Sequence, residues 1–125
     1  MIRVLVVEDE AMNRDMLARR LAWEGYSVSV ATNGEEGIVA ALEQMPDLIV
    51  MDLGLPRLDG WEAARQLKAM AQTARIPIVA LSAYALSEDR TRALEAGCDE
   101  FETKPVEFSR LFGKMIRLLA LSRAG

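Results

Sequence analysis

The chain has 125 residues, of which 51% are hydrophobic and 27% charged, the size and composition of one globular domain. A single cysteine, Cys98, and no histidine exclude an internal disulfide, a Cys/His zinc site and nucleophiles that rely on histidine. The 15 basic and 19 acidic residues give a net charge of −4, the wrong sign for holding nucleic acid or an anionic membrane by overall charge. We therefore predict no direct binding to nucleic acid or to membranes.

The amino-terminal residues run from a short apolar stretch into Glu8 and Asp9, without the longer apolar segment and cleavage site of a secretory signal. No apolar stretch approaches the 18 or more residues of a membrane span. Both features predict a cytoplasmic protein.

Five short apolar runs predict strands, at residues 2–7, 26–31, 47–51, 76–81 and 100–103. The first, third and fourth runs are almost continuously apolar and rich in Val, Ile and Leu. This composition is typical of parallel strands that are covered on both faces.

Longer segments with helical spacing follow each strand. The first, from residue 11 to about 24, should end at Gly25 and place four apolar residues on adjoining faces: Met12, Met16, Leu17 and Leu21. Three polar residues are expected to cap the next helices: Asn33, Asp59 and Ser87. The last helix, after Pro105, should bury a stripe of apolar residues: Phe108, Leu111, Met115 and Leu118 or Leu119. We interpret Trp23, Trp61 and Cys98 as packing residues.

Five strand-then-helix units predict an α/β fold, a doubly wound five-stranded parallel sheet with five helices on its two faces. In such sheets ligands bind beyond the carboxyl ends of the strands. Five residues with functional side chains stand at the predicted ends: Glu8, Asp9, Asp52, Ser82 and Lys104.

Three of these residues, Glu8, Asp9 and Asp52, are carboxylates that would repel one another unless a cation compensates. A small set of hard oxygen ligands suits Mg²⁺, which often completes its shell with phosphate oxygens. Lys104 would add a positive charge from the opposite side, and Ser82 a hydroxyl donor. A carboxylate nucleophile with these groups makes a site for phosphoryl transfer.

Four segments, residues 6–10, 51–60, 78–83 and 104–105, stand in the order and at the strand ends found in response-regulator receiver domains of two-component signalling. The chain resembles this family over residues 2 to about 121, and is similar to stand-alone receivers or those of hybrid kinases. The resemblance implies the flavodoxin-like strand order 2-1-3-4-5. It also implies one receiver domain over residues 1–125, with no effector domain, acting as a monomer or weak dimer.

The resemblance makes Asp52 the phosphoacceptor, which takes a phosphoryl group from the phosphohistidine of a sensor histidine kinase or histidine phosphotransfer protein. Asp9, Asp52 and the backbone carbonyl of Gly54 would then ligate Mg²⁺, with Glu8 holding it through water. By this reading the protein is a switch that catalyses only its own phosphorylation and dephosphorylation.

By the same resemblance, Lys104 would pair with the phosphoryl group, and Ser82 would hydrogen-bond to it in the activated state. Phe101 occupies the position of the switch aromatic, and Tyr84 would shape access to the pocket. A downstream protein target would bind the fourth helix, fifth strand and fifth helix, whose polar surface residues we expect to be Arg90, Glu95, Glu102 and Arg110.

The chain departs from the common family pattern at three positions. Glu8 stands where Asp is frequent, Phe101 replaces the commoner Tyr, and Gly54 offers no side chain to shield an acyl phosphate, which leaves the phosphoryl lifetime open.

Two other functions compete with the switch. A phosphatase with an aspartate nucleophile would want a second Asp two residues after it, where Gly54 stands. A phospho-independent interaction module would have no need of the intact set of site residues, which are Glu8, Asp9, Asp52, Ser82 and Lys104.

Overall fold

The structure, a computed structural model, describes residues 1–55, 58–83 and 87–124, with the backbone alone for residues 87, 89, 123 and 124. Tyr84 lies outside the described residues. The strands are β1 (Arg3–Val7), β2 (Ser27–Ala31), β3 (Leu48–Asp52), β4 (Ile78–Ser82) and β5 (Glu100–Thr103). The helices are α1 (Ala11–Trp23), α2 (Gly34–Gln44), α3 (Gly60–Ala69), α4 (Ser87–Glu95) and α5 (Phe108–Ala124).

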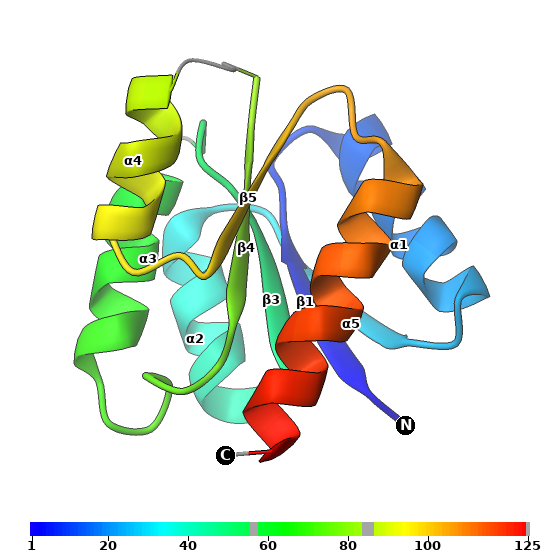
Figure 1. Ribbon diagram of the computed structural model, residues 1–125, viewed down its shortest axis with the longest axis horizontal. Coiled ribbons are helices and arrows are strands. Elements are labelled where there is room, and N and C mark those ends of the chain that lie inside the picture. Colours follow the sequence, from blue (N-terminus) through cyan, green and yellow to red (C-terminus); the bar gives the residue numbers. More distant parts are fainter. Residues whose placement is uncertain (56–57, 84–86, 125) are drawn as a thin grey trace.

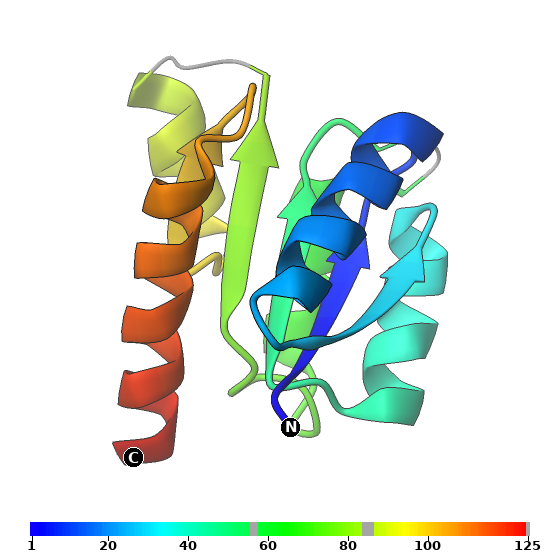
Figure 2. The same ribbon diagram turned by 90° about the vertical axis from the view of Figure 1, so that its right-hand side faces the viewer.

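All strands pair in parallel in one sheet of order β2-β1-β3-β4-β5, which confirms the predicted α/β fold and strand order (Figure 1). Strands β3 and β4 are buried at every residue, as their continuous apolar sequences predict. Helices α1 and α5 cover one face, and α2, α3 and α4 cover the other (Figures 1 and 2). No helix in the described ranges is long and apolar enough to cross a membrane.

The core has two layers because successive side chains of a strand point to opposite faces. In β1, Leu5 and Val7 pack in the layer under α2, α3 and α4, and Val4 and Val6 pack in the layer under α1 and α5. Two fully enclosed residues of α5, Leu111 and Met115, belong to the second layer, as the predicted stripe requires.

Helix α1 presents a narrower buried stripe than we predicted. Only Leu17 and Leu21 are buried, while Met12 is 79% and Met16 45% exposed. The interpretation of Trp23 as a packing residue is wrong, since it is 86% exposed. Helical spacing groups these side chains on adjoining faces, but the sheet covers only the stripe that carries Leu17 and Leu21.

Side chains cap the helices largely as expected. Asn33 Oδ1 accepts a hydrogen bond from Glu36 N at 2.9 Å, and Asp59 Oδ1 accepts one from Glu62 N at 2.9 Å. Ser87 is the first residue of α4, and its side chain lies outside the described part. Gly25 follows α1 with a φ of 98°, the left-handed conformation expected of a residue that ends a helix.

Both ends of the described chain lie at the same edge of the sheet. The amino-terminal residues and the end of α5 stand at the bottom in Figures 1 and 2, whereas the carboxyl ends of the strands point to the top. The strand ends that carry the predicted site residues are therefore remote from both termini.

Candidate functional site

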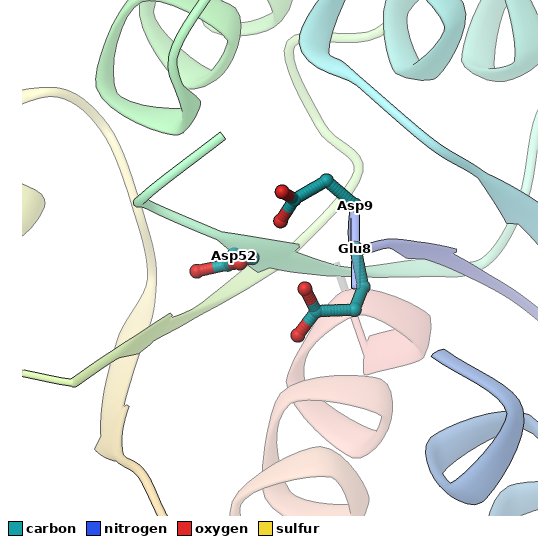
Figure 3. A group of neighbouring side chains, drawn as sticks. All are labelled: Glu8, Asp9 and Asp52. Atoms are coloured by element: carbon teal, nitrogen blue, oxygen red, sulfur yellow. The ribbon is translucent and has the colours of Figure 1, made fainter. Parts of the chain in front are cut away.

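An acidic pocket, formed by Glu8, Asp9 and Asp52, lies at the carboxyl ends of β1 and β3. One carboxylate oxygen from each residue lies within 4.8 Å of the other two, and the side chains converge in Figure 3. Glu8 is 1% and Asp52 5% exposed, while Asp9 is open to solvent. The parallel register brings these residues together because β1 and β3 are neighbours in the sheet.

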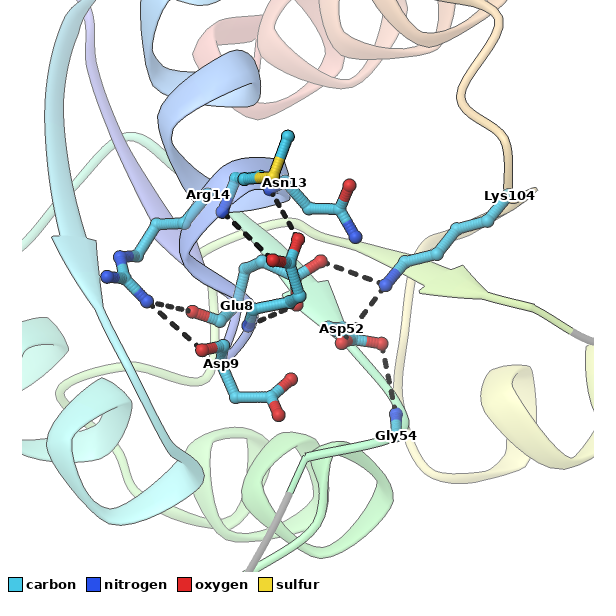
Figure 4. Close-up of polar contacts among 9 residues, drawn as sticks. Glu8, Asp9, Asn13, Arg14, Asp52, Gly54 and Lys104 are labelled. Carbon is cyan, nitrogen blue, oxygen red and sulfur yellow. Dashed lines mark hydrogen bonds and ion pairs between the residues drawn. The ribbon is translucent and has the colours of Figure 1, made fainter.

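Lys104 enters this pocket from the segment that follows β5. Its Nζ lies 2.8 Å from Glu8 Oε1 and 3.1 Å from Asp52 Oδ2 (Figure 4). Its backbone N–H donates to the Ser82 carbonyl at 2.8 Å, which fixes the segment against the end of β4. Lys104 thus connects two of the three carboxylates.

Burial and charge act against each other in this cluster. Burial raises the pKa of Glu8, the hydrogen bonds from Lys104 and the Glu10 N–H lower it, and Asp52 raises it again, with a net upward shift. Burial alone would lower the pKa of Lys104, but the bond to Glu8 and the charge of Asp52 outweigh burial and raise it. The ammonium group therefore stays charged at neutral pH.

Backbone donors orient the two buried carboxylates. Gly54 N donates to Asp52 Oδ1 at 3.0 Å, so each Asp52 oxygen has a partner, Gly54 or Lys104. Glu10 N donates to Glu8 Oε2 at 3.1 Å. These bonds hold both carboxylates in one orientation in the pocket.

A pocket of about 300 Å³ opens over Asp52 and Lys104. Its remaining lining residues are Leu53, Gly54, Trp61, Ser82 and Ala83. Ser82 is 4% exposed and stands at the end of β4, where the sequence places it.

Trp61 is a lining residue of this pocket that we did not predict as part of the site. It is half-buried on α3, and the guanidinium carbon of Arg92 on α4 lies 4.5 Å from its ring centroid. Its packing role is confirmed, since it contacts the core layer under α2, α3 and α4. In the sequence, an aromatic residue at the second position of a helix gives no sign that it also lines a pocket.

Phe101, the predicted switch aromatic, and Glu102, a predicted surface residue, are both buried in β5. Phe101 is 5% exposed and belongs to the core layer under α2, α3 and α4. The expectation that Glu102 is a polar surface residue is wrong, because it is 5% exposed. Cations of α5 cover it: Lys114 Nζ lies 3.1 Å from Oε2, and Arg110 Nε lies 3.3 Å from Oε1.

A second, mainly apolar pocket of about 540 Å³ has Glu8 and Lys104 among its lining residues. Residues from α1, the segment after β5 and the start of α5 complete it: Asn13, Met16, Leu17, Pro105, Val106 and Phe108. Apolar surface therefore adjoins the acidic pocket directly.

The donor set of the acidic pocket fits a hard divalent cation. Its three carboxylates supply oxygen ligands within reach of one point, and open access at Asp9 leaves room for water. In the described part of the chain, this is the group of acidic residues whose spacing suits a metal ion.

Comparison with known proteins agrees with this geometry. The family model of the response regulator receiver domain matches residues 4–116. The response regulator MprA of Mycolicibacterium vanbaalenii is 37% identical over 118 residues, which cover 94% of this chain and 50% of that protein. The chain thus spans about half the length of the curated relatives it matches.

Solved structures share the fold over almost the whole chain. The receiver domain of a sensor histidine kinase from Pseudomonas aeruginosa, with a magnesium ion coordinated in its active site cleft, is 34% identical with a TM-score of 0.88, covering 95% of this chain and 98% of that one. NtrX from Brucella abortus is 30% identical with a TM-score of 0.90, covering 99% of this chain and 28% of that one. With the family model matching most of its length, this chain belongs to the response regulator receiver domain family of two-component signalling.

Proposed function

We propose that this protein is a phosphorylation-dependent switch in which Asp52 accepts a phosphoryl group. The observation that carries the proposal is the placement of Asp52, whose carboxylate lies in an acidic pocket with the Lys104 ammonium 3.1 Å from Oδ2. Phosphoryl transfer needs an aligned nucleophile and positive charge close to the phosphoryl oxygens. Asp52 and Lys104 would supply both.

In the proposed reaction an Asp52 carboxylate oxygen attacks the phosphorus of a phosphohistidine on another protein. The new O–P bond forms an acyl phosphate, and the N–P bond breaks with its electrons returning to the partner's imidazole. The donor histidine would lie outside these 125 residues, which contain none. A sensor histidine kinase, a histidine phosphotransfer protein or a small acyl phosphate would fill this role.

The acidic pocket would need Mg²⁺ for this reaction. We propose that Asp9, Asp52 and the Gly54 carbonyl hold the ion and that Glu8 acts through water, by analogy with the magnesium in the Pseudomonas receiver structure. Bound Mg²⁺ would offset charge on the phosphoryl oxygens. Lys104 would then pair with the phosphoryl group from its place beside Asp52.

A phosphoryl group adds about −1.5 to −2 charges to a pocket that is already acidic. We propose that Ser82, which lines the 300 Å³ pocket over Asp52 and Lys104, donates its hydroxyl to that group, and that Phe101 changes its packing in response. The altered surface of α4, β5 and α5 would bind a downstream protein. The apolar pocket beside Glu8 and Lys104 would receive the phosphoryl donor protein, because Lys104, the ion-pair partner of Asp52, is one of its lining residues.

Intact mass after incubation with acetyl phosphate and Mg²⁺ tests the proposal. Wild type should gain one phosphoryl group, and Asp52→Asn should gain none. Asp15→Asn is the matched control, because Asp15 is an exposed carboxylate on α1 and should leave phosphorylation intact. A wild-type protein that stays unmodified would contradict the proposal and favour a phospho-independent interaction module.

The phosphatase alternative makes a different prediction. It requires multiple turnovers of unrelated phosphate esters, whereas a switch consumes one phosphoryl donor for each cycle of its own phosphorylation. Gly54 has no side chain to act as the second carboxylate of such an enzyme, which favours the switch.

A further inference from the structure

Arg14, in the first turn of α1, directs its guanidinium back to the end of β1. Its Nη1 donates to the Glu8 carbonyl at 3.1 Å and to the Asp9 carbonyl at 3.2 Å (Figure 4). Arg14 is half-buried, and its backbone N–H donates to the Glu10 carbonyl at 2.9 Å. One side chain thus binds the backbone of both residues whose carboxylates form one side of the acidic pocket.

These two carbonyls lie beyond the regular sheet. The last parallel pairs of β1 join Val7 to Ala31 and Val7 to Met51, and Glu8 N still donates to the Ala31 carbonyl at 3.0 Å. From there the chain leaves the sheet and enters α1, where Glu10 accepts bonds from the N–H groups of Met12 and Asn13. Arg14 therefore fixes a turn that strand pairing does not.

The charge of Arg14 also acts on Glu36, an acidic residue in the first turn of α2. Hydrogen bonds from Thr32 lower the pKa of Glu36, and the charge of Arg14 adds to this shift. Glu36 also accepts a bond from Asn33, the residue that caps α2. The printed hydrogen bonds of the Arg14 side chain itself go to the end of β1, at the Glu8 and Asp9 carbonyls.

We propose that Arg14 is a positioning residue for the acidic pocket, which holds the backbone of Glu8 and Asp9 so that the Asp9 carboxylate faces Asp52. In this role Arg14 touches neither the phosphoryl group nor Mg²⁺. The inference rests on the proposed function, because that function includes Mg²⁺ binding at the acidic pocket. Both carbonyls accept from one nitrogen, Nη1, which stands one bond farther from the backbone than a lysine Nζ would, so we expect the shorter lysine side chain not to make both bonds.

A positioning role and a charge role predict opposite results. A positive charge near a cation site weakens cation binding. If Arg14 acted only through its charge, a lysine variant would bind Mg²⁺ as tightly as wild type, and a neutral variant would bind it more tightly. If Arg14 is a positioning residue, both variants should bind Mg²⁺ more weakly than wild type. Loss of groups that orient metal ligands typically costs about 10–100-fold in metal affinity.

The test measures Mg²⁺ affinity from the fluorescence of Trp61, which lines the Asp52 pocket. All variants carry Trp23→Phe, because Trp23 is exposed and would add an uninformative signal. Arg14→Lys and Arg14→Met are compared with Arg19→Lys and Arg19→Met, matched changes at an exposed arginine of the same helix. We expect Mg²⁺ binding about tenfold or more weaker for Arg14→Lys, weaker for Arg14→Met, and unchanged for both Arg19 variants.

Phosphorylation by acetyl phosphate gives a second readout. The Arg14→Lys variant should need more Mg²⁺ for half-maximal rate but approach the wild-type rate at saturation, because Asp52 and Lys104 are intact. Wild-type Mg²⁺ affinity in Arg14→Lys, or tighter Mg²⁺ binding in Arg14→Met, would overturn the inference. A lower melting temperature of the variants with unchanged Mg²⁺ affinity would overturn it as well. If instead wild type binds no Mg²⁺ and is not phosphorylated, the proposed function itself has failed.

Discussion

Lys104 places one positive charge between two carboxylates that are almost completely buried. Its Nζ contacts Glu8 Oε1 and Asp52 Oδ2, and nearby Asp9 adds a third negative charge. Buried carboxylates are tolerated only when a cation or several hydrogen bonds compensate for lost solvation. The lysine therefore has a structural role before any phosphoryl group arrives.

Replacing Lys104 by Met should destabilise the metal-free protein. Breaking a fully buried ion pair costs about 3–5 kcal/mol, and we expect about 2 kcal/mol here because the Lys104 side chain is 21% exposed. Urea unfolding in EDTA measures the change. Mg²⁺ should restore more stability to this variant than to wild type, since a divalent cation replaces the lost charge, and an unchanged urea midpoint would contradict this.

Cys98 makes stability depend on pH in the alkaline range. Burial raises the pKa of its thiol from about 9 to about 12, with Asp99 adding to the shift and Lys68 opposing it. The folded chain keeps the thiol proton where the unfolded chain releases it. The contribution of the Cys98 thiol to the stability of the folded state is therefore complete below about pH 9 and is lost as pH rises towards 12.

Wild type is compared with Cys98→Ala at each pH. Tyrosines and lysines titrate in both proteins, so their effects on stability cancel in the difference. We expect the stability advantage of wild type to shrink by about 1.4 kcal/mol for each pH unit between 9 and 12. Urea unfolding at pH 8, 10 and 11 measures the difference. A constant difference across these conditions would count against a buried neutral thiol.

At the scale of elements, the sequence patterns located every strand, and the start of every helix, to within about two residues, because continuous apolar runs and capping residues have direct structural causes. The strand predicted at 100–103 matches β5, and the strand predicted at 47–51 is observed as β3 at Leu48–Asp52. The same patterns did not distinguish which stripe of α1 meets the sheet. They missed Trp61 and Arg14 because contacts between separate elements leave no periodic signature.

Two glycines show how α3 and α5 differ in their surroundings. A Cβ at Gly60, the first residue of α3, would overlap the Asp52 carbonyl oxygen and lie 2.7 Å from Leu53 Cα. A Cβ at Gly113 within α5 would meet nothing within 4 Å. The start of α3 thus packs directly on the backbone of the proposed phosphoacceptor.

The two alanine substitutions should change stability in opposite directions. Gly60→Ala should lower the free energy of unfolding by about 2 kcal/mol or more through overpacking, and slow phosphorylation by displacing Asp52. Gly113→Ala should raise it by about 0.5–1 kcal/mol, because alanine favours a helix interior over glycine. Thermal unfolding followed by circular dichroism compares both variants with wild type. A destabilising effect of Gly113→Ala would contradict the open space observed around Gly113.

At the scale of the whole molecule, charge is distributed unevenly. The net charge is only −4, yet three carboxylates meet at one edge of the sheet. Their mutual repulsion is present only when the fold brings β1 and β3 together. A cation that binds this edge should therefore stabilise the folded state as a whole.

Magnesium should raise the thermal midpoint of wild type in a concentration-dependent way. A ligand at 100 times its dissociation constant stabilises a folded protein by about 2.7 kcal/mol, and EDTA should reverse the gain. Asp52→Asn should lose most of this stabilisation, while Asp15→Asn should keep it. Equal stabilisation of wild type and Asp52→Asn would show that the ion binds elsewhere.

The position of the two chain ends has a practical consequence for tethering. Both ends leave the molecule at the edge of the sheet opposite the acidic pocket (Figures 1 and 2). A dye, affinity tag or surface linker joined to either end would start on the far side from Asp52. The protein can therefore be immobilised by either terminus with its acidic face pointing into solution, where a phosphoryl donor can reach it.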